Sequence, residues 1–199
     1  MPNTEKLLTE IGEGGLFRTS DLEALGMSRS TIQRMVDRGQ AEQISHGLYR
    51  LVEGEITEHI GLIAVQKKIP DGIICLLSAL QFHGIGTQLP REVWIAIDRK
   101  ARKPKDPGFP IHIVRFSVVN AQYGIETHEL LGVPVRITSI ARTVVDCFRY
   151  RNKIGMDVAL EALKDVLDRR LASRDEILRT AEACRAKTVV RPYLEGMSA

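Results

Sequence analysis

The sequence predicts an α+β protein in two parts, with an N-terminal winged helix-turn-helix domain over residues 1–54 and a mixed α/β domain over residues 55–199. The first part is predicted because residues 17–51 contain two short helical segments, a tight turn and a two-stranded hairpin, which is the order of a winged helix-turn-helix. The second is predicted because about four strand-like segments precede C-terminal helices instead of alternating with them, as is typical of α+β domains.

The helix-turn-helix has recognisable start and stop signals. Ser20 and Glu23 match the S-x-x-E capping box, so we expect the first helix to begin at Ser20. We expect Gly26 to end it, because glycine adopts positive φ at little cost. The second helix should run from Ser28, a favoured N-cap residue, to Arg38.

This second helix carries an apolar stripe and a polar side. Ile32, Met35 and Val36 recur at helical spacing and should face the core. Arginine and glutamine can form paired hydrogen bonds with guanine and adenine, whereas serine and the amides at a helix N-terminus suit phosphate. The predicted DNA-binding residues of the helix are Ser28, Arg29, Ser30, Gln33, Arg34 and Arg38.

A wing is predicted directly after this helix. The segments Glu42–Ser45 and Leu48–Val52 flank His46-Gly47, a two-residue turn in which the glycine can take positive φ. Wings of this kind run along phosphates or the minor groove, which makes Ser45, His46 and Arg50 further candidate DNA contacts.

The charge of this region leaves a second interpretation open. Residues 1–52 carry six Lys or Arg against seven Asp or Glu, so the electrostatic footprint of a DNA binder is weak. Helix-turn-helix units also serve as dimerisation or protein-docking modules, and that alternative stays open at this point.

The second part is predicted to start with two helices, Ile56–Ile69 and Leu77–His83, the latter capped by Ser78 or the residue before it. Strands follow over residues 92–98, 111–116, 125–130 and 133–137, and we expect them to be mostly antiparallel because two of their connections are short. From Thr138 or Ser139 the pattern is helical to the end of the chain, with a capping box at residues 173–176.

The densest charge run lies between the first two of these strands. Its cations are candidate phosphate contacts, either to operator DNA or to an RNA, and a solvated loop explains them equally well. They are Arg99, Lys100, Arg102, Lys103 and Lys105.

Composition and motifs exclude several classes of protein. The 199 residues are 44% hydrophobic and 27% charged, with a formal charge of +3, which is ordinary for a globular protein. Three distant cysteines fit neither a disulfide framework nor a zinc site, and we see no secretion signal or membrane span, so a cytoplasmic location is expected.

Catalytic motifs are missing as well, so we predict no catalytic residues, metal or cofactor, and no enzyme. Glu92, Asp98 and Lys100 give only a faint pattern of nuclease carboxylates. Asp146 lies four residues after Arg142, and we interpret that spacing as a structural ion pair on one helix face.

Three segments, together with the winged-helix order before them, carry a family resemblance: LLSALQFHGI, WIAIDRKARKP and GVPVRITSIARTVVDCFRYRNKIGMDVALEALKD. The chain resembles the AbiEi antitoxin family of type IV toxin-antitoxin systems over nearly its whole length. The resemblance implies a winged helix that represses its own operon and a C-terminal antitoxin domain. It also implies a role in bacterial phage defence and a neighbouring nucleotidyltransferase toxin of the AbiEii kind, which the antitoxin counteracts without a stable toxin complex. Some relatives carry an additional nuclease domain after this region, and we expect no such activity here because the sequence ends at Ala199.

Two functions from different classes follow. The first is an antitoxin that is also a DNA-binding autorepressor, acting on its operator as a monomer or as a dimer on inverted repeats, with no membrane partner. The second is a ligand-sensing winged-helix transcription factor without antitoxin activity, which would use the apolar sheet face and the loop from Gly84 to Arg91.

Overall fold

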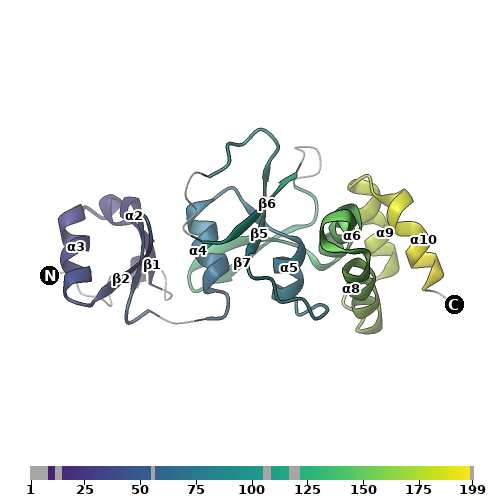
Figure 1. Cartoon of the computed structure of the whole chain (residues 1–199), viewed down its shortest axis with the longest axis horizontal. Helices are drawn as coiled ribbons and strands as arrows, with labels where there is room; N and C mark the ends of the chain where they lie inside the picture. The colour runs from purple at the N-terminus through teal and green to yellow at the C-terminus, as the bar shows by residue number, and fades with distance from the viewer. Residues whose placement is uncertain (1–8, 12–14, 55–56, 105–108, 117–121, 198–199) are drawn as a thin grey trace. The chain divides into compact units, whose positions relative to one another are not determined.

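The computed structural model describes residues 9–11, 15–54, 57–104, 109–116 and 122–197. The chain divides into two compact units (Figure 1). The first comprises Met1–Asp71, Pro104–Pro110 and His128–Val135, and the second comprises Gly72–Lys103, Ile111–Thr127 and Arg136–Ala199. The expected domain boundary after residue 54 stays a prediction.

The first unit contains the winged helix. Two helices pack on a three-stranded sheet of order β1-β3-β2, in which β3 pairs antiparallel with both neighbours. The elements are β1 (Leu16–Arg18), α2 (Thr19–Ala24), α3 (Arg29–Asp37), β2 (Ala41–Ser45) and β3 (Leu48–Leu51). The α+β fold class with an N-terminal winged helix is confirmed, and strand β1 is an addition to the two-stranded wing that the sequence predicted.

The start of α2 differs from the prediction. Its N-cap is Arg18, and the Asp21 carboxylate accepts a hydrogen bond from the Arg18 backbone N–H at 2.9 Å. The expected Ser20–Glu23 capping box is therefore wrong. Glu23 instead bonds Arg29 of the next helix, as described below. The helix starts earlier because β1 leads directly into it and fixes Arg18 in extended conformation.

Helix α4 (Ile60–Lys68) follows the winged helix in this unit. It begins later than the predicted start at Ile56, a residue that lies outside the described ones. Lys67 on its last turn lies 3.8 Å from the Asp21 carboxylate. Burial lowers the pKa of the Lys67 ammonium, and the nearby Asp21 charge opposes that change.

The second sheet has the order β6-β5-β4-β8-β7. Its strands are β4 (Ile73–Ile74), β5 (Val93–Asp98), β6 (Ile111–Phe116), β7 (Ile125–Leu130) and β8 (Val133–Thr138). The expectation of mostly antiparallel pairing is wrong, because β5 pairs parallel with β6 and β4 pairs parallel with β8. The two-residue strand β4 was not predicted, and it joins the two halves of the sheet.

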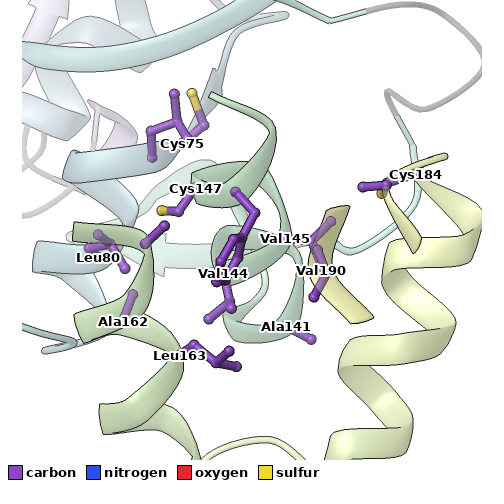
Figure 2. Close-up of a cluster of buried hydrophobic side chains, with 14 of the residues drawn as sticks. Cys75, Leu80, Ala141, Val144, Val145, Cys147, Ala162, Leu163, Cys184 and Val190 are labelled. Atoms are coloured by element: carbon purple, nitrogen blue, oxygen red, sulfur yellow. The ribbon is translucent and has the colours of Figure 1, made fainter. Parts of the chain in front are cut away.

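Helices pack around the hydrophobic core of the second unit. They are α5 (Leu76–Phe82), α6 (Ile140–Arg149), α7 (Arg151–Ile154), α8 (Met156–Asp168), α9 (Arg174–Ala183) and α10 (Lys187–Gly196). Figure 2 shows α6 at the centre, with Val144 and Val145 facing side chains such as Leu163 of α8 and Val190 of α10. The N-caps Ser139 and Ser173 accept the expected backbone hydrogen bonds.

One helix start in this unit was mispredicted. Helix α5 begins after Cys75, which is its N-cap, and neither Ser78 nor Leu77 caps it. The Ser78 hydroxyl is buried and accepts a hydrogen bond from the backbone N–H of Trp94 at 2.9 Å, so it ties α5 to strand β5.

Candidate nucleic-acid interface

Helix α3 is held by its apolar stripe and presents its polar side to solvent. Ser28 is the N-cap residue, as predicted, and Gly39 follows the helix with φ +67°. Ile32 and Met35 are buried in the core with Phe17 and Leu22. The predicted DNA-binding residues of this helix are all exposed: Ser28, Arg29, Ser30, Gln33, Arg34 and Arg38.

Intrahelical and neighbouring contacts orient this polar side. The Arg29 guanidinium donates to Glu23 of α2 at 2.9 Å, and Gln33 donates to Asp37 at 2.9 Å. Arg34 donates to the backbone carbonyl of Ser30 at 3.2 Å. These partners hold the long side chains against the helix, with their outer surfaces accessible to a ligand.

The wing contains a β-bulge that changes its register. Ser45 pairs with Leu48, but Gln43 pairs with Tyr49 and Glu42 with Arg50, so one residue of β2 is extra between residues 43 and 45. The bulge sets Glu42 beside Arg50, whose guanidinium lies 2.6 Å from the Glu42 carboxylate and is only 16% exposed. Arg50 is thus committed to an ion pair within the wing.

A cleft of about 300 Å³ separates α3 from the wing. Three predicted residues meet there, namely Arg29, Gln33 and His46. The full lining is Thr19, Arg29, Ile32, Gln33, Gln43, His46, Gly47 and Tyr49. The arrangement places amide, guanidinium and imidazole groups around a groove bounded by a helix and a hairpin, which suits hydrogen bonding to an extended polar ligand.

Sequence reasoning missed Thr19, Gln43 and Tyr49 of this cleft. Tyr49 stacks on Phe17 with ring centroids 5.6 Å apart, so its ring is fixed by the core of the unit. An unbulged hairpin would place Gln43 opposite Arg50, and no signal in the sequence marks the bulge. Gln43 and Tyr49 could have been found only from the true register.

Two further candidates, Arg38 and Ser45, lie at the ends of their elements. Arg38 is the C-cap of α3, at the opposite end from Ser28. Ser45 ends β2, but its side chain is outside the described part of the structure. The backbone carbonyl of His46 accepts a hydrogen bond from the Lys68 ammonium of α4, which fixes the turn. Contacts of all these residues with DNA stay predictions.

The basic loop after β5 belongs to the second unit. Arg99, Lys100, Arg102 and Lys103 are exposed, whereas Lys105 lies outside the described residues. The loop thus keeps the exposed positive charge that the sequence predicted, and its phosphate contacts stay a prediction.

Neither a metal site nor a membrane span is present in the part of the chain that the structure describes. No group of three or more His, Cys, Asp or Glu side chains is placed to hold a metal ion there. In the same residues, no helix has the length and apolar character needed to cross a bilayer.

The winged-helix part has a recognisable family. Residues 5–52 match the family described as "Transcriptional regulator, AbiEi antitoxin". The match covers the helix-turn-helix and the wing, so the resemblance of this part to AbiEi antitoxins is confirmed. The antitoxin character of the later segments stays a prediction.

A solved structure has a similar fold. It is the crystal structure of the RV2827C protein from Mycobacterium tuberculosis, with a TM-score of 0.61 and 15% sequence identity over 90% of this chain and 69% of that chain. At this identity the likeness concerns the fold alone. No curated protein matches the sequence.

Proposed function

We propose that this protein is a cytoplasmic antitoxin and DNA-binding transcriptional autorepressor that counteracts a nucleotidyltransferase toxin of the AbiEii kind. The match of residues 5–52 to AbiEi antitoxin regulators supports the regulatory half. The cleft between α3 and the wing is the observation that carries the DNA-binding half, since it gathers Arg29, Gln33 and His46 with Gln43 on one groove. The toxin is neutralised without a stable complex, as in the type IV systems that the chain resembles.

The geometry suggests how the operator is read. Glutamine makes bidentate hydrogen bonds to adenine, and arginine to guanine, when they enter the major groove from a recognition helix. Gln33 and Arg34 lie on the exposed side of α3 and would reach base edges. Ser28 and Ser30 at the helix start would contact phosphate. The wing residues Gln43 and His46 would contact the backbone beside the groove.

The first experiment measures operator binding by footprinting of the upstream DNA and by titration of a labelled operator duplex. We expect Gln33→Ala and Arg34→Ala each to weaken binding by about 1–3 kcal/mol and to relax the base preference at one position. Gln40→Ala is the matched control, because Gln40 is an exposed glutamine just beyond α3 that does not line the cleft.

The outcomes separate base reading from general charge. Gln43→Ala is expected to weaken binding to all DNA sequences alike if Gln43 contacts the DNA backbone. Equal affinity for operator and scrambled duplex would refute the repressor proposal. A loss for Gln40→Ala as large as for Gln33→Ala would show that the cleft is not the reading surface. The footprint length distinguishes a monomer from a dimer on inverted repeats.

The second experiment tests the antitoxin half by co-expressing the full chain with the adjacent open reading frame. We expect the neighbour alone to stop growth and this protein to restore it. Because the antitoxin activity is assigned to residues 55–199, the Gln33→Ala variant should bind the operator more weakly and still restore growth. A toxic neighbour that this protein fails to counteract would contradict the antitoxin half and favour the ligand-sensing transcription factor.

A further inference from the structure

The basic loop Arg99–Lys103 has a backbone that is fixed by a single arginine. The Arg115 Nη1 atom of β6 donates to three loop carbonyls, those of Asp98 at 3.0 Å, Arg99 at 3.0 Å and Ala101 at 2.6 Å. The Lys100 backbone N–H donates in addition to the Asp98 carboxylate at 2.7 Å. The loop is therefore a shaped element, and its side chains project from a fixed backbone.

The cations of this loop differ from cations elsewhere in their ion pairing. Among the described residues, no side-chain ion pair involves any of the four loop cations: Arg99, Lys100, Arg102 and Lys103. Other exposed cations are paired along their helices, for example Lys164 with Asp168 at 2.5 Å and Arg191 with Glu195 at 2.6 Å. A loop with a fixed backbone and exposed cations is suited to bind phosphate groups.

An aromatic side chain and further cations adjoin this loop through Arg115. The Tyr150 hydroxyl donates to the Arg115 backbone carbonyl at 3.0 Å, so the end of α6 lies against the end of β6. The Tyr150 ring is partly exposed. Arg149 and Lys153 lie 5.8 Å from the centroid of this ring. Cations and a partly exposed ring thus share one region of the second unit, and the Phe116 ring lies 6.3 Å from the same ring.

We propose that this region, the loop Arg99–Lys103 together with Arg115, Tyr150 and Lys153, binds a single-stranded segment of a nucleic acid. The loop cations and Lys153 contact successive phosphates, and an unstacked base packs on the Tyr150 ring. The proposal goes beyond operator reading by α3, and it does not rest on it, because all of these residues belong to the second unit.

The aromatic ring is what favours a single strand over a duplex. A duplex keeps its bases stacked on one another and offers only its backbone to a surface of this kind. A single strand offers both phosphates and base faces, and stacking on an aromatic side chain contributes about 1–3 kcal/mol per base. A basic loop beside a partly exposed tyrosine matches that second combination. RNA and single-stranded DNA share this chemistry, so the experiment compares them.

The test is fluorescence anisotropy with the full chain and labelled oligonucleotides of about 16 nucleotides, the upper site size of small single-strand binding domains. The probes are one mixed-sequence RNA, the DNA strand of the same sequence, and a scrambled DNA duplex. The variants are the fourfold change Arg99→Gln, Lys100→Gln, Arg102→Gln and Lys103→Gln, and the pair Tyr150→Leu and Tyr150→Phe. Tryptophan fluorescence of each variant checks that the unit is folded, since Trp94 is buried in it.

A matched control removes the same charge elsewhere in the unit. It substitutes glutamine for four exposed arginines, Arg91, Arg170, Arg179 and Arg185. We expect the loop variant to lose about tenfold or more in single-strand affinity, with a salt slope less steep by about 3, because each phosphate contact on a single strand accounts for about 0.7. Tyr150→Leu should weaken single-strand binding and Tyr150→Phe should retain it, while the control changes affinity by less than about threefold.

Three outcomes would overturn the proposal. One is failure of the unaltered protein to bind either single-stranded probe. Another is equal loss for the loop variant and the control variant, which would indicate unspecific charge attraction. A third is loss of duplex binding alone, which would make the loop a contact of the operator backbone. A stronger affinity for the RNA than for the DNA strand would identify recognition of the 2′-hydroxyl. If Tyr150→Leu does not fold, the fourfold loop variant alone tests the proposal, because its substitutions leave the core unchanged.

Discussion

We expect the buried ion pair of helix α6 to be a large contributor to the stability of the second unit. Arg142 and Asp146 are both fully buried, and the Arg142 Nε donates to the Asp146 carboxylate at 2.7 Å. Arg142 Nη1 also donates to the Tyr123 carbonyl at 2.6 Å, and its guanidinium lies 4.9 Å from the Phe116 ring centroid. The second carboxylate oxygen of Asp146 accepts from Arg149 at 2.7 Å.

Removing one partner leaves the other as an uncompensated buried charge, which costs about 3–5 kcal/mol. The destabilisation by Asp146→Leu should lie near the upper end of this range, because the substitution deprives the fully buried Arg142 of its counter-charge. Arg142→Met should lie near the lower end, because Asp146 keeps its bond to Arg149. The double variant should lose less than Asp146→Leu alone, since no unpaired charge then remains in the core.

The assay is urea unfolding followed by tryptophan fluorescence. Trp94 is the only tryptophan of the chain and is buried in the second unit, so the transition reports that unit. Lys164→Met is the control, because Lys164 and Asp168 have the same spacing with side chains 71% and 61% exposed, and it should leave the urea midpoint nearly unchanged. Single losses below about 1 kcal/mol, or a double variant equal to the sum of the singles, would refute the reasoning.

Three further predictions concern glycine, cysteine and carboxylate side chains. Gly124→Ala should destabilise the unit by about 1–3 kcal/mol more than Gly84→Ala in the same urea assay, because both glycines have positive φ but only at Gly124 would a Cβ lie 2.8 Å from the Arg142 Cβ. The three buried cysteines are Cys75, Cys147 and Cys184. They should react slowly with a thiol reagent in the native protein and fully in guanidinium chloride, because burial raises the pKa of each thiol. Rapid labelling of any of them in the native protein would contradict this prediction. The backbone N–H of Gly86 holds the pKa of Asp165 below its usual range. The difference in free energy of unfolding between the unaltered protein and Asp165→Asn should therefore reach its maximum above pH about 4 and disappear as the pH falls through the lowered pKa. A difference that grows at acidic pH would contradict this role of Asp165.

Local signals predicted helix ends well where they act through a single residue. Ser139 and Ser173 cap the helices that the sequence assigned to them, and Gly26 and Gly39 follow helices with positive φ. Ser28 takes the predicted N-cap position, although its side chain forms no capping hydrogen bond. The cap of α2 was mispredicted because two acidic residues, Asp21 and Glu23, lie close together at the start of this helix. Only the unforeseen strand β1, which delivers Arg18 in extended conformation, decides in favour of Asp21.

Long-range pairing was beyond the reach of the sequence. The direction of β5 relative to β6 depends on the path of the segment that connects them. The periodicity of side chains in a strand is the same for parallel and antiparallel pairing, so it does not indicate the direction. Strand β4 has only two residues, too few to show any alternation. For the Arg142–Asp146 pair, the spacing of four residues predicted the correct partner. It could not give the burial, because tertiary packing alone removes the pair from water.

The same limit applied to the candidate interface and has a functional consequence. The bulge in β2 was invisible in the sequence, and it pairs Arg50 with Glu42, while Arg29 is paired with Glu23. Two of the cations expected to attract DNA are therefore partly neutralised by carboxylates of the same unit. Cations that already have counter-charges release fewer salt ions on binding, so operator recognition by α3 should depend on hydrogen bonds to bases and show a shallow salt dependence. The loop Arg99–Lys103 has the opposite character, and a steep salt dependence of single-strand binding with a shallow one for the operator would assign the two surfaces to two different ligands.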